Sequence, residues 1–177
     1  GLALHNYAES YRTLPPGYVS QFDAADVDSG PGWGWAAMLL PQLDQGPLYA
    51  GIDFGLPIES LANAAPRKVP LPLMRCPSDD AGPTFPALMR NVATGVPTGF
   101  VCDVASSNYV GMYGTTEPLE PSDGIFFRNS RITFSDISDG SSQTIALGER
   151  SHNLGEATWV GSVTGAILYG DPSDGVG

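Results

Sequence analysis

Glycine and proline place the strongest limit on what this chain can fold into, because proline cannot continue a helix and glycine weakens helices and strands alike. The sequence contains 22 glycines and 16 prolines among 177 residues, well above the roughly 12% combined share of an ordinary protein. Hydrophobic residues still make up 42% of the chain. This composition predicts a single folded domain over residues 1–177 that is rich in loops and has a hydrophobic core.

Charge and residue counts exclude several classes of function. The chain carries 19 acidic and 8 basic residues, a formal net charge of −11, which argues against binding nucleic acid through its phosphates. It has no apolar run of the roughly 18 residues that suggest a membrane span. Two cysteines and two histidines are too few for the usual closely spaced zinc site, for haem or for an iron–sulfur cluster. Cys76 and Cys102 allow one disulfide in an oxidising compartment, and two buried thiols are the alternative.

The N-terminal part of the chain has helical periodicity. Leu4, Tyr7, Ala8 and Tyr11 fall on one helix face, which predicts a helix over residues 1–12 that ends before the prolines at 15 and 16. No capping residue precedes this helix and no initiator Met is present, so we expect these residues to be cut from a longer chain. A second helix is expected over roughly 33–43.

Short strands are expected in the C-terminal part, where apolar runs alternate with turn residues. Residues 18–32 are expected to be a loop, and residues 69–75 an extended segment within a Pro- and Gly-rich region. The expected strands are 109–113, 124–128, 131–134, 143–149, 157–160 and 166–169, with a hairpin turn at Asn129 and Ser130. We therefore predict an α+β fold, in which helix 1–12 packs on a main antiparallel sheet within 109–169.

Five strings in order along the chain resemble one family, the pilin-like secreted proteins of unknown function abundant in Planctomycetes. The strings are Gly1-Leu-Ala-Leu-His-Asn-Tyr7 with Leu14-Pro-Pro-Gly17, Gly34-Trp-Ala-Ala-Met-Leu-Leu-Pro-Gln-Leu-Asp-Gln45 with Leu48-Tyr49, Cys76-Pro-Ser-Asp79, Gly124-Ile-Phe, and Ile137-Ser-Asp-Gly-Ser-Ser-Gln-Thr-Ile145 with Gly148-Glu-Arg150. Family members carry a prepilin-type cleavage and methylation signal and usually end in a His-x9-Asp-Gly motif. Both features are missing from these residues, and Gln143 stands where the family usually has Asn.

The resemblance implies a pilin or pseudopilin architecture, in which residues 1–12 are the end of a long N-terminal helix. It implies a structural subunit of a type IV pilus-like surface filament or of a type II secretion pseudopilus. The protein would be secreted, at the cell surface or in the periplasm, and anchored in the inner membrane before truncation. Its partners would be other pilin-like subunits or secretion-system components. The chain without its long helix would be a monomer or weak dimer.

Clusters of acidic residues in Gly- and Ser-rich loops are candidates for calcium binding, because calcium takes six to eight oxygen ligands in such loops. None has EF-hand spacing, and Asx turns or helix caps are the alternative. The resemblance adds some support, since pilin-like proteins often hold a loop ion. The candidate clusters are Asp23, Asp26 and Asp28; Asp79 and Asp80; Asp136 and Asp139; and Asp171 and Asp174.

Two other classes of function remain open. One is a calcium-dependent hydrolase acting on a small ester or lactone, in which Glu149 or His152 would activate water. Ser151 next to His152 is a poor nucleophile candidate, because adjacent strand residues point to opposite faces. The other class is a polysaccharide-binding module that stacks sugars on Trp33 and Trp35. The alternative for these two residues is ordinary packing of both indoles in the core.

Overall fold

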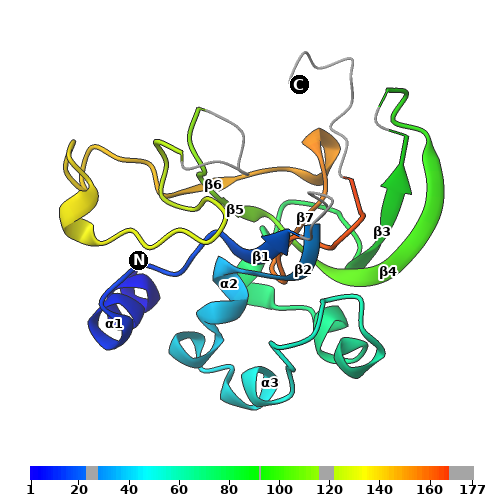
Figure 1. The fold of residues 1–177 in the computed structure, drawn as a ribbon, viewed down its shortest axis with the longest axis horizontal. Helices are drawn as coiled ribbons and strands as arrows, with labels where there is room; N and C mark the ends of the chain where they lie inside the picture. The colour runs from blue at the N-terminus through cyan, green and yellow to red at the C-terminus, as the bar shows by residue number, and fades with distance from the viewer. Residues whose placement is uncertain (23–27, 92, 116–121, 168–177) are drawn as a thin grey trace.

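A computed structural model describes residues 1–22, 28–91, 93–115 and 122–167 (Figure 1). Helices and 3-10 turns (η) alternate with three small antiparallel sheets, ordered β1-β2, β3-β4-β7 and β5-β6, which confirms the α+β fold. The elements are α1 Leu2–Tyr11, β1 Tyr18–Phe22, β2 Asp28–Gly34, α2 Trp35–Met38, η1 Leu40–Leu43, α3 Gly46–Ala50, η2 Leu61–Asn63, η3 Pro66–Lys68, η4 Pro72–Met74, β3 Thr84–Arg90, β4 Pro97–Ser107, β5 Tyr109–Gly111, η5 Phe134–Asp136, β6 Leu147–Glu149, η6 His152–Leu154 and β7 Ala157–Thr158. Among the described residues, no helix is both long and apolar enough to cross a bilayer.

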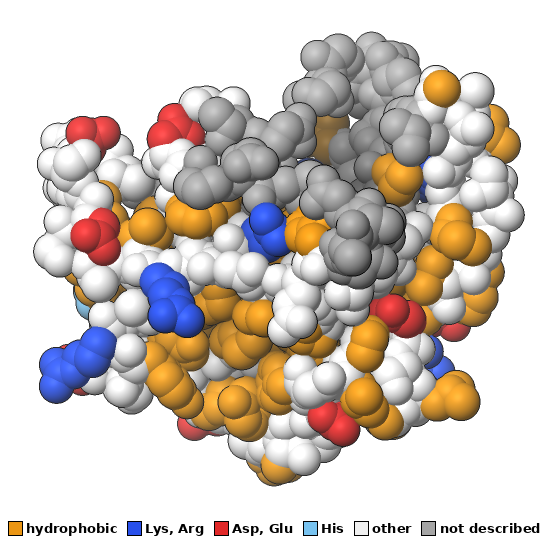
Figure 2. Space-filling view, viewed as in Figure 1, with side chains coloured by type: hydrophobic (Ala, Val, Ile, Leu, Met, Phe, Trp, Pro, Cys, Tyr) orange, Lys and Arg blue, Asp and Glu red, His pale blue; other side chains and the backbone are white. Residues whose placement is uncertain are grey.

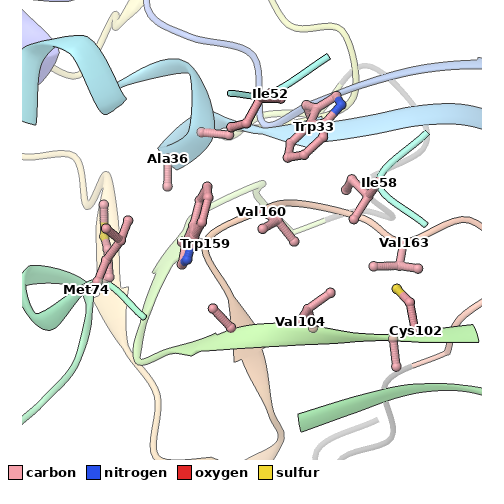
Figure 3. Packing of buried hydrophobic residues seen from close by; sticks show 14 of the residues in the cluster. Trp33, Ala36, Ile52, Ile58, Met74, Cys102, Val104, Trp159, Val160 and Val163 are labelled. Carbon is pink, nitrogen blue, oxygen red and sulfur yellow. The ribbon is translucent and has the colours of Figure 1, made fainter. Parts of the chain in front are cut away.

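Two buried tryptophans organise the main core (Figure 3). Trp33 is 0% exposed and Trp159 is 1% exposed, and they pack with Val104 and Val160 between β2, β4 and the segment after β7. Each indole N–H is satisfied, since Trp33 donates to the Leu56 carbonyl at 3.1 Å and Trp159 to the Val69 carbonyl at 3.0 Å. Trp33 is thus a core residue, as the core-packing alternative predicts, and it is not available to stack a sugar.

Helix α1 confirms the predicted N-terminal helix over most of its length, but it does not pack on a main sheet. Its face with Leu4, Tyr7 and Ala8 belongs to a second cluster, formed mostly by loop residues and completed by Leu147 of β6. The other members are Leu14, Leu39, Ile125 and Phe126, with Trp35, Leu43, Ile132, Ile137 and Ala146 packed against them. The helix therefore rests on η1 and the loops of residues 125–137.

The predicted hairpin over residues 124–134 is wrong. Ile125 and Phe126 are adjacent and both buried, so the segment lacks the alternation of a half-exposed strand. Its backbone bonds instead to the chain after α1, with Leu14 N–H donating to the Ile132 carbonyl at 2.7 Å and Gly17 N–H to the Phe127 carbonyl at 3.0 Å. At Gly17 a Cβ would lie 2.1 Å from the Phe126 carbonyl oxygen, so this approach requires glycine.

The sheets are also not confined to residues 109–169. Strand β4 has 11 residues and lies outside all of the expected strands. The expected loop at 18–32 contains β1 and most of β2, which pair with each other. Proline is tolerated at Pro86 because β3 is an edge strand. Residues 69–75 contain the 3-10 turn η4 rather than one extended segment. Of the expected last strand, the described residues Ala166 and Ile167 are not in a strand, and the remainder lies outside the described residues.

Strands β3 and β4 form an arm on the right of the view in Figure 1. Hydrophobic side chains lie along this arm in Figure 2, and Met89, Val96 and Phe100 are exposed there. The arm is held at its base, where Ser106 and Ser107 of β4 pair with Thr158 and Ala157 of β7.

Candidate functional site

The structure brings together two sequence candidates that lie 73 residues apart. Nδ1 of His152 lies 2.9 Å from Oδ1 of Asp79 and 3.6 Å from Oδ1 of Asp80. One potential ligand atom from each of these three residues lies within 4.8 Å of the others. The acidic pair follows η4, and His152 begins η6. We call these three residues the Asp–His cluster.

Asn108, between β4 and β5, joins the two segments that carry the cluster. Its side-chain oxygen accepts a hydrogen bond from Cys76 N–H at 2.9 Å, and its amide nitrogen donates to the Arg150 carbonyl at 3.1 Å. Its backbone adds two bonds, to the Met74 carbonyl at 2.8 Å and from Arg150 N–H at 2.7 Å. Asn108 is only 3% exposed. This one residue thus holds the chain before Asp79 next to the chain before His152.

Asp79 uses its carboxylate to complete this junction. It accepts hydrogen bonds from Ala81 N–H and His152 N–H, both at 3.0 Å, as well as the contact from the His152 ring. The side chain is 5% exposed. These donors, first the Ala81 amide and then the His152 amide, hold the pKa of the Asp79 carboxyl well below its ordinary value. Asp79 is therefore an ionised group, and both of its carboxylate oxygens accept hydrogen bonds from neighbouring segments of the chain.

The contact with Asp79 also determines which nitrogen of His152 is available. A neutral imidazole that donates Nδ1–H to a carboxylate keeps the lone pair on Nε2. His152 is 32% exposed and lines a cavity of about 160 Å³ with Asp80, Ser106, Ser107 and Glu156. Burial raises the pKa of the Glu156 carboxyl, although the positive charges of Arg90 and His152 act in the opposite direction. An imidazole and a carboxyl whose pKa is raised by burial thus share one cavity.

The hydroxyl groups around this cavity are occupied by the backbone. Ser106 donates to the Gly82 carbonyl at 2.7 Å, and Ser107 donates to the Met74 carbonyl at 3.2 Å. Ser151 caps η6 by accepting from Asn153 N–H. Among the described residues, no serine hydroxyl is hydrogen-bonded to the His152 ring, whose contact is with Asp79, so the arrangement is not a Ser–His–Asp triad.

The potential metal ligands of the Asp–His cluster suit a divalent cation that takes nitrogen as well as oxygen ligands better than they suit calcium. Calcium takes six to eight oxygens, whereas imidazole nitrogen with carboxylate oxygen suits zinc or manganese. A cation held by Nδ1 of His152 and the two carboxylates would replace the Nδ1 proton, which faces Asp79 when no ion is bound. The separations of 2.9 and 3.6 Å between Nδ1 and the carboxylate oxygens bracket the roughly 3 Å between adjacent ligands of an ion with bonds of about 2.1 Å. Because the Asp80 side chain is 92% exposed, water has access to the remaining coordination positions of such an ion.

The other candidate residues are not brought into this cluster. The carboxylate of Asp28 accepts from the Ser20 hydroxyl and from Gly30 N–H, and Asp136 forms a capping box with Thr133. These two are turn and cap residues, as the alternative to calcium binding predicts. Asp139 is exposed, and Asp23, Asp26, Asp171 and Asp174 lie outside the described residues.

Glu149 and the cysteines also lie elsewhere. Glu149 is exposed and pairs with Tyr109 across β5 and β6. Cys76 and Cys102 are both free thiols, and only Cys102 is fully buried. Cys102 belongs to the main core, while the Cys76 sulfur lies 3.0 Å from the Ser78 hydroxyl.

Sequence reasoning missed Asn108 and Glu156. Asn108 follows the Ser-Ser pair that ends β4, and no local sequence pattern there predicts its two long-range side-chain hydrogen bonds. Glu156 stands four residues after His152, a spacing that is meaningful on a helix face, but η6 ends at Leu154. Nothing in the local sequence therefore distinguishes Glu156 from a surface carboxylate.

Comparison with known proteins gives a family. Searches found no match among curated proteins and none among solved structures. A family model described as "Protein of unknown function (DUF1559)" matches residues 1–169, which include every residue of the site described above. The chain therefore belongs to this family of proteins of unknown function.

Proposed function

We propose that this chain is the globular domain of a secreted, pilin-like structural subunit, part of a surface filament or a secretion pseudopilus. The observation that supports it best is the use made of Asp79, the last residue of the Cys76-Pro-Ser-Asp79 string. Its carboxylate is almost fully buried and joins three donors of the chain itself. Asp79 of this motif thus holds its own segment against the distant segment that begins at His152, as expected of a structural domain.

The position of helix α1 supports the same proposal. The helix lies at the edge of the domain (Figure 1) and packs through one face only, while Leu2 and Tyr11 are exposed. Its first turn contains no acidic residue and no side-chain cap, although such groups ordinarily satisfy a helix N-terminus. An N-terminal helix at the rim of a small domain is what a pilin-like subunit requires.

The test uses the natural gene product with whatever its gene encodes upstream, detected with an antibody against residues 1–177. Mechanical shearing of intact cells should release it with surface fibres, or crosslinking should place it in an envelope secretion complex. Mass spectrometry of the mature N-terminus should find a methylated residue after a basic cleavage site. A dispersed protein with an unmethylated N-terminus would contradict the proposal.

A divalent cation at the Asp–His cluster is part of this proposal. Asp79, Asp80 and His152 would hold it, and it would reinforce the junction between the two segments. The nitrogen ligand favours zinc or manganese over the calcium expected from the acidic loops.

A second candidate, a metal-assisted hydrolase for a small ester or lactone, is favoured by the cavity shared by His152 and Glu156. Nε2 of His152 would take a proton from water, the resulting hydroxide would attack the carbonyl, and the Glu156 carboxyl would protonate the departing alkoxide. Asp79 would orient the imidazole.

Lactone hydrolysis, followed by titration of the acid released, tests this candidate with and without zinc, manganese or calcium. His152→Ala and Glu156→Gln should each lower turnover by roughly a hundredfold. Glu149→Gln is the matched control, because Glu149 is exposed and is not among the cavity residues. Absent turnover, or equal losses in Glu149→Gln and Glu156→Gln, would contradict the hydrolase.

A further inference from the structure

A second cavity, of about 770 Å³, lies where residues of all three sheets meet. Its volume is within the range of small-molecule sites, about 300–1,000 Å³. The wall is largely apolar and aromatic, and hydroxyl groups are spread over it. The residues that define its character are Tyr18, Trp35, Tyr109, Tyr113 and Arg150.

Arg150 is the cation of this cavity, and its hydrogen bonding is incomplete. Nη2 donates to the Glu156 carbonyl at 2.6 Å, but the buried Nε has no hydrogen-bond partner. Arg150 forms no ion pair with a carboxylate of the part of the chain that the structure describes. Burial lowers the pKa of the guanidinium, but arginine remains charged in proteins.

Arg67 shows what a purely structural arginine looks like in the same fold. It is 8% exposed, and it donates through Nε to the Asp103 carbonyl and through Nη1 to the carbonyls of Ile58 and Ser60. Arg150 has one such bond and faces a cavity. Because a partly buried charge without a counter-charge is costly, an anion in the cavity would be stabilised there.

The acidic group on the cavity wall does not supply that counter-charge. Asp28 also lines the cavity, but its carboxylate is engaged by the Ser20 hydroxyl and the Gly30 amide. Tyr113, by contrast, lies close enough to Arg150 to interact with it electrostatically. A guanidinium and a neighbouring phenol form a suitable pair of donors for one carboxylate.

We propose that this cavity binds an acidic saccharide of the uronic acid type. The sugar carboxylate would pair with the Arg150 guanidinium, and the ring would lie against the aromatic wall. An inorganic anion alone would leave most of this aromatic surface uncovered. The proposal goes beyond the structural role above and does not depend on it.

The test is calorimetric titration of the chain with galacturonate, with galactose as the neutral sugar of the same ring. Galacturonate should bind measurably and galactose at least about tenfold more weakly, since galactose lacks the charge-assisted bonds. Arg150→Gln should weaken galacturonate binding about tenfold or more. Arg131→Gln is the matched control, because Arg131 is exposed and is not among the cavity residues.

Further variants keep the test decisive if Arg150→Gln fails to fold. Arg150→Lys keeps the charge but loses the planar fork, and Tyr113→Phe removes only the neighbouring hydroxyl at an exposed position. Each should weaken galacturonate binding severalfold. No binding of galacturonate, equal binding of galactose, or unchanged affinity in these variants would overturn the proposal. Binding of 4-hydroxyphenylacetate without galacturonate would overturn the assignment to a saccharide.

Discussion

Asn108→Ala should loosen the fold and the Asp–His cluster together. The substitution removes two side-chain hydrogen bonds and leaves Cys76 N–H and the Arg150 carbonyl without these partners. Each unsatisfied buried group costs about 1–3 kcal/mol. The expected loss is therefore about 2–6 kcal/mol in the free energy of unfolding, a large part of the roughly 5–15 kcal/mol of a typical domain.

Urea unfolding followed by tryptophan fluorescence measures this loss, and Asn63→Ala is the matched control. Asn63 is also buried, and its side chain bonds to the backbone of Asp53, Leu56 and Pro57. Both variants should be destabilised. Only Asn108→Ala should also speed hydrogen exchange at the two amides that Asp79 accepts, those of Ala81 and His152.

Two results would refute this reasoning about the junction. One is a loss of less than about 1 kcal/mol in Asn108→Ala, which is within the effect of an ordinary surface substitution and its error. The other is equal acceleration of exchange at the Ala81 and His152 amides in Asn63→Ala, since general destabilisation would then explain the opening.

Three further predictions concern acid, thiols and metal. The pKa of folded Asp79 lies below its ordinary 3.8, so its contribution to stability is present above about pH 4 and is lost as pH falls through the folded value. Asp79→Asn should therefore reduce the loss of stability at acid pH. Asp136→Asn, which removes another carboxyl with a lowered pKa, should also reduce that loss but should leave metal binding unchanged. Thiol titration should find Cys76 reactive in the native protein and buried Cys102 reactive only after unfolding; a single disulfide would contradict this. Zinc or manganese should raise the melting temperature of stripped protein more than calcium does, and the shift should disappear in His152→Ala; an equal shift in that variant would exclude the Asp–His cluster as its source.

Local sequence patterns predicted the elements that carry their own periodicity or a helix-breaking residue. The apolar face of residues 1–12 forms α1. The expected helix at 33–43 is present from Trp35 onward as α2 and η1, which meet at Leu39, and Pro41 lies in the first turn of η1. The expected strand at 109–113 contains β5. In each case the periodicity or the helix-breaking residue lies within the element itself.

Segments without a clear local pattern could not be predicted in this way. Strand β4 gains its regularity from β3 across a chain reversal and from β7 at least fifty positions later. Residues 124–134 have strand-like composition, but their backbone partners lie at Leu14 and Gly17. Long-range pairing decided these segments, and local composition does not record it.

The site shows the same division. Asp79, Asp80 and His152 were each predicted from their chemistry, but in two different roles, as a calcium loop and as a catalytic base. Their meeting depends on Asn108, whose bonds span 32 and 42 residues. A single sequence identifies such donors and acceptors but does not say which of them are partners.

The contact between Asp79 and His152 is the central claim, and a two-bond proton–nitrogen correlation spectrum of the histidine rings tests it most directly. With His152 in its neutral form, Nδ1 should carry the proton and Nε2 should have the shift of an unprotonated nitrogen, because Nδ1 faces the Asp79 carboxylate at 2.9 Å. His5, which stacks on Phe134, is the internal reference, and Asp79→Asn should change the His152 pattern alone. A proton on Nε2 of His152 would place two acceptors against each other and would contradict the account.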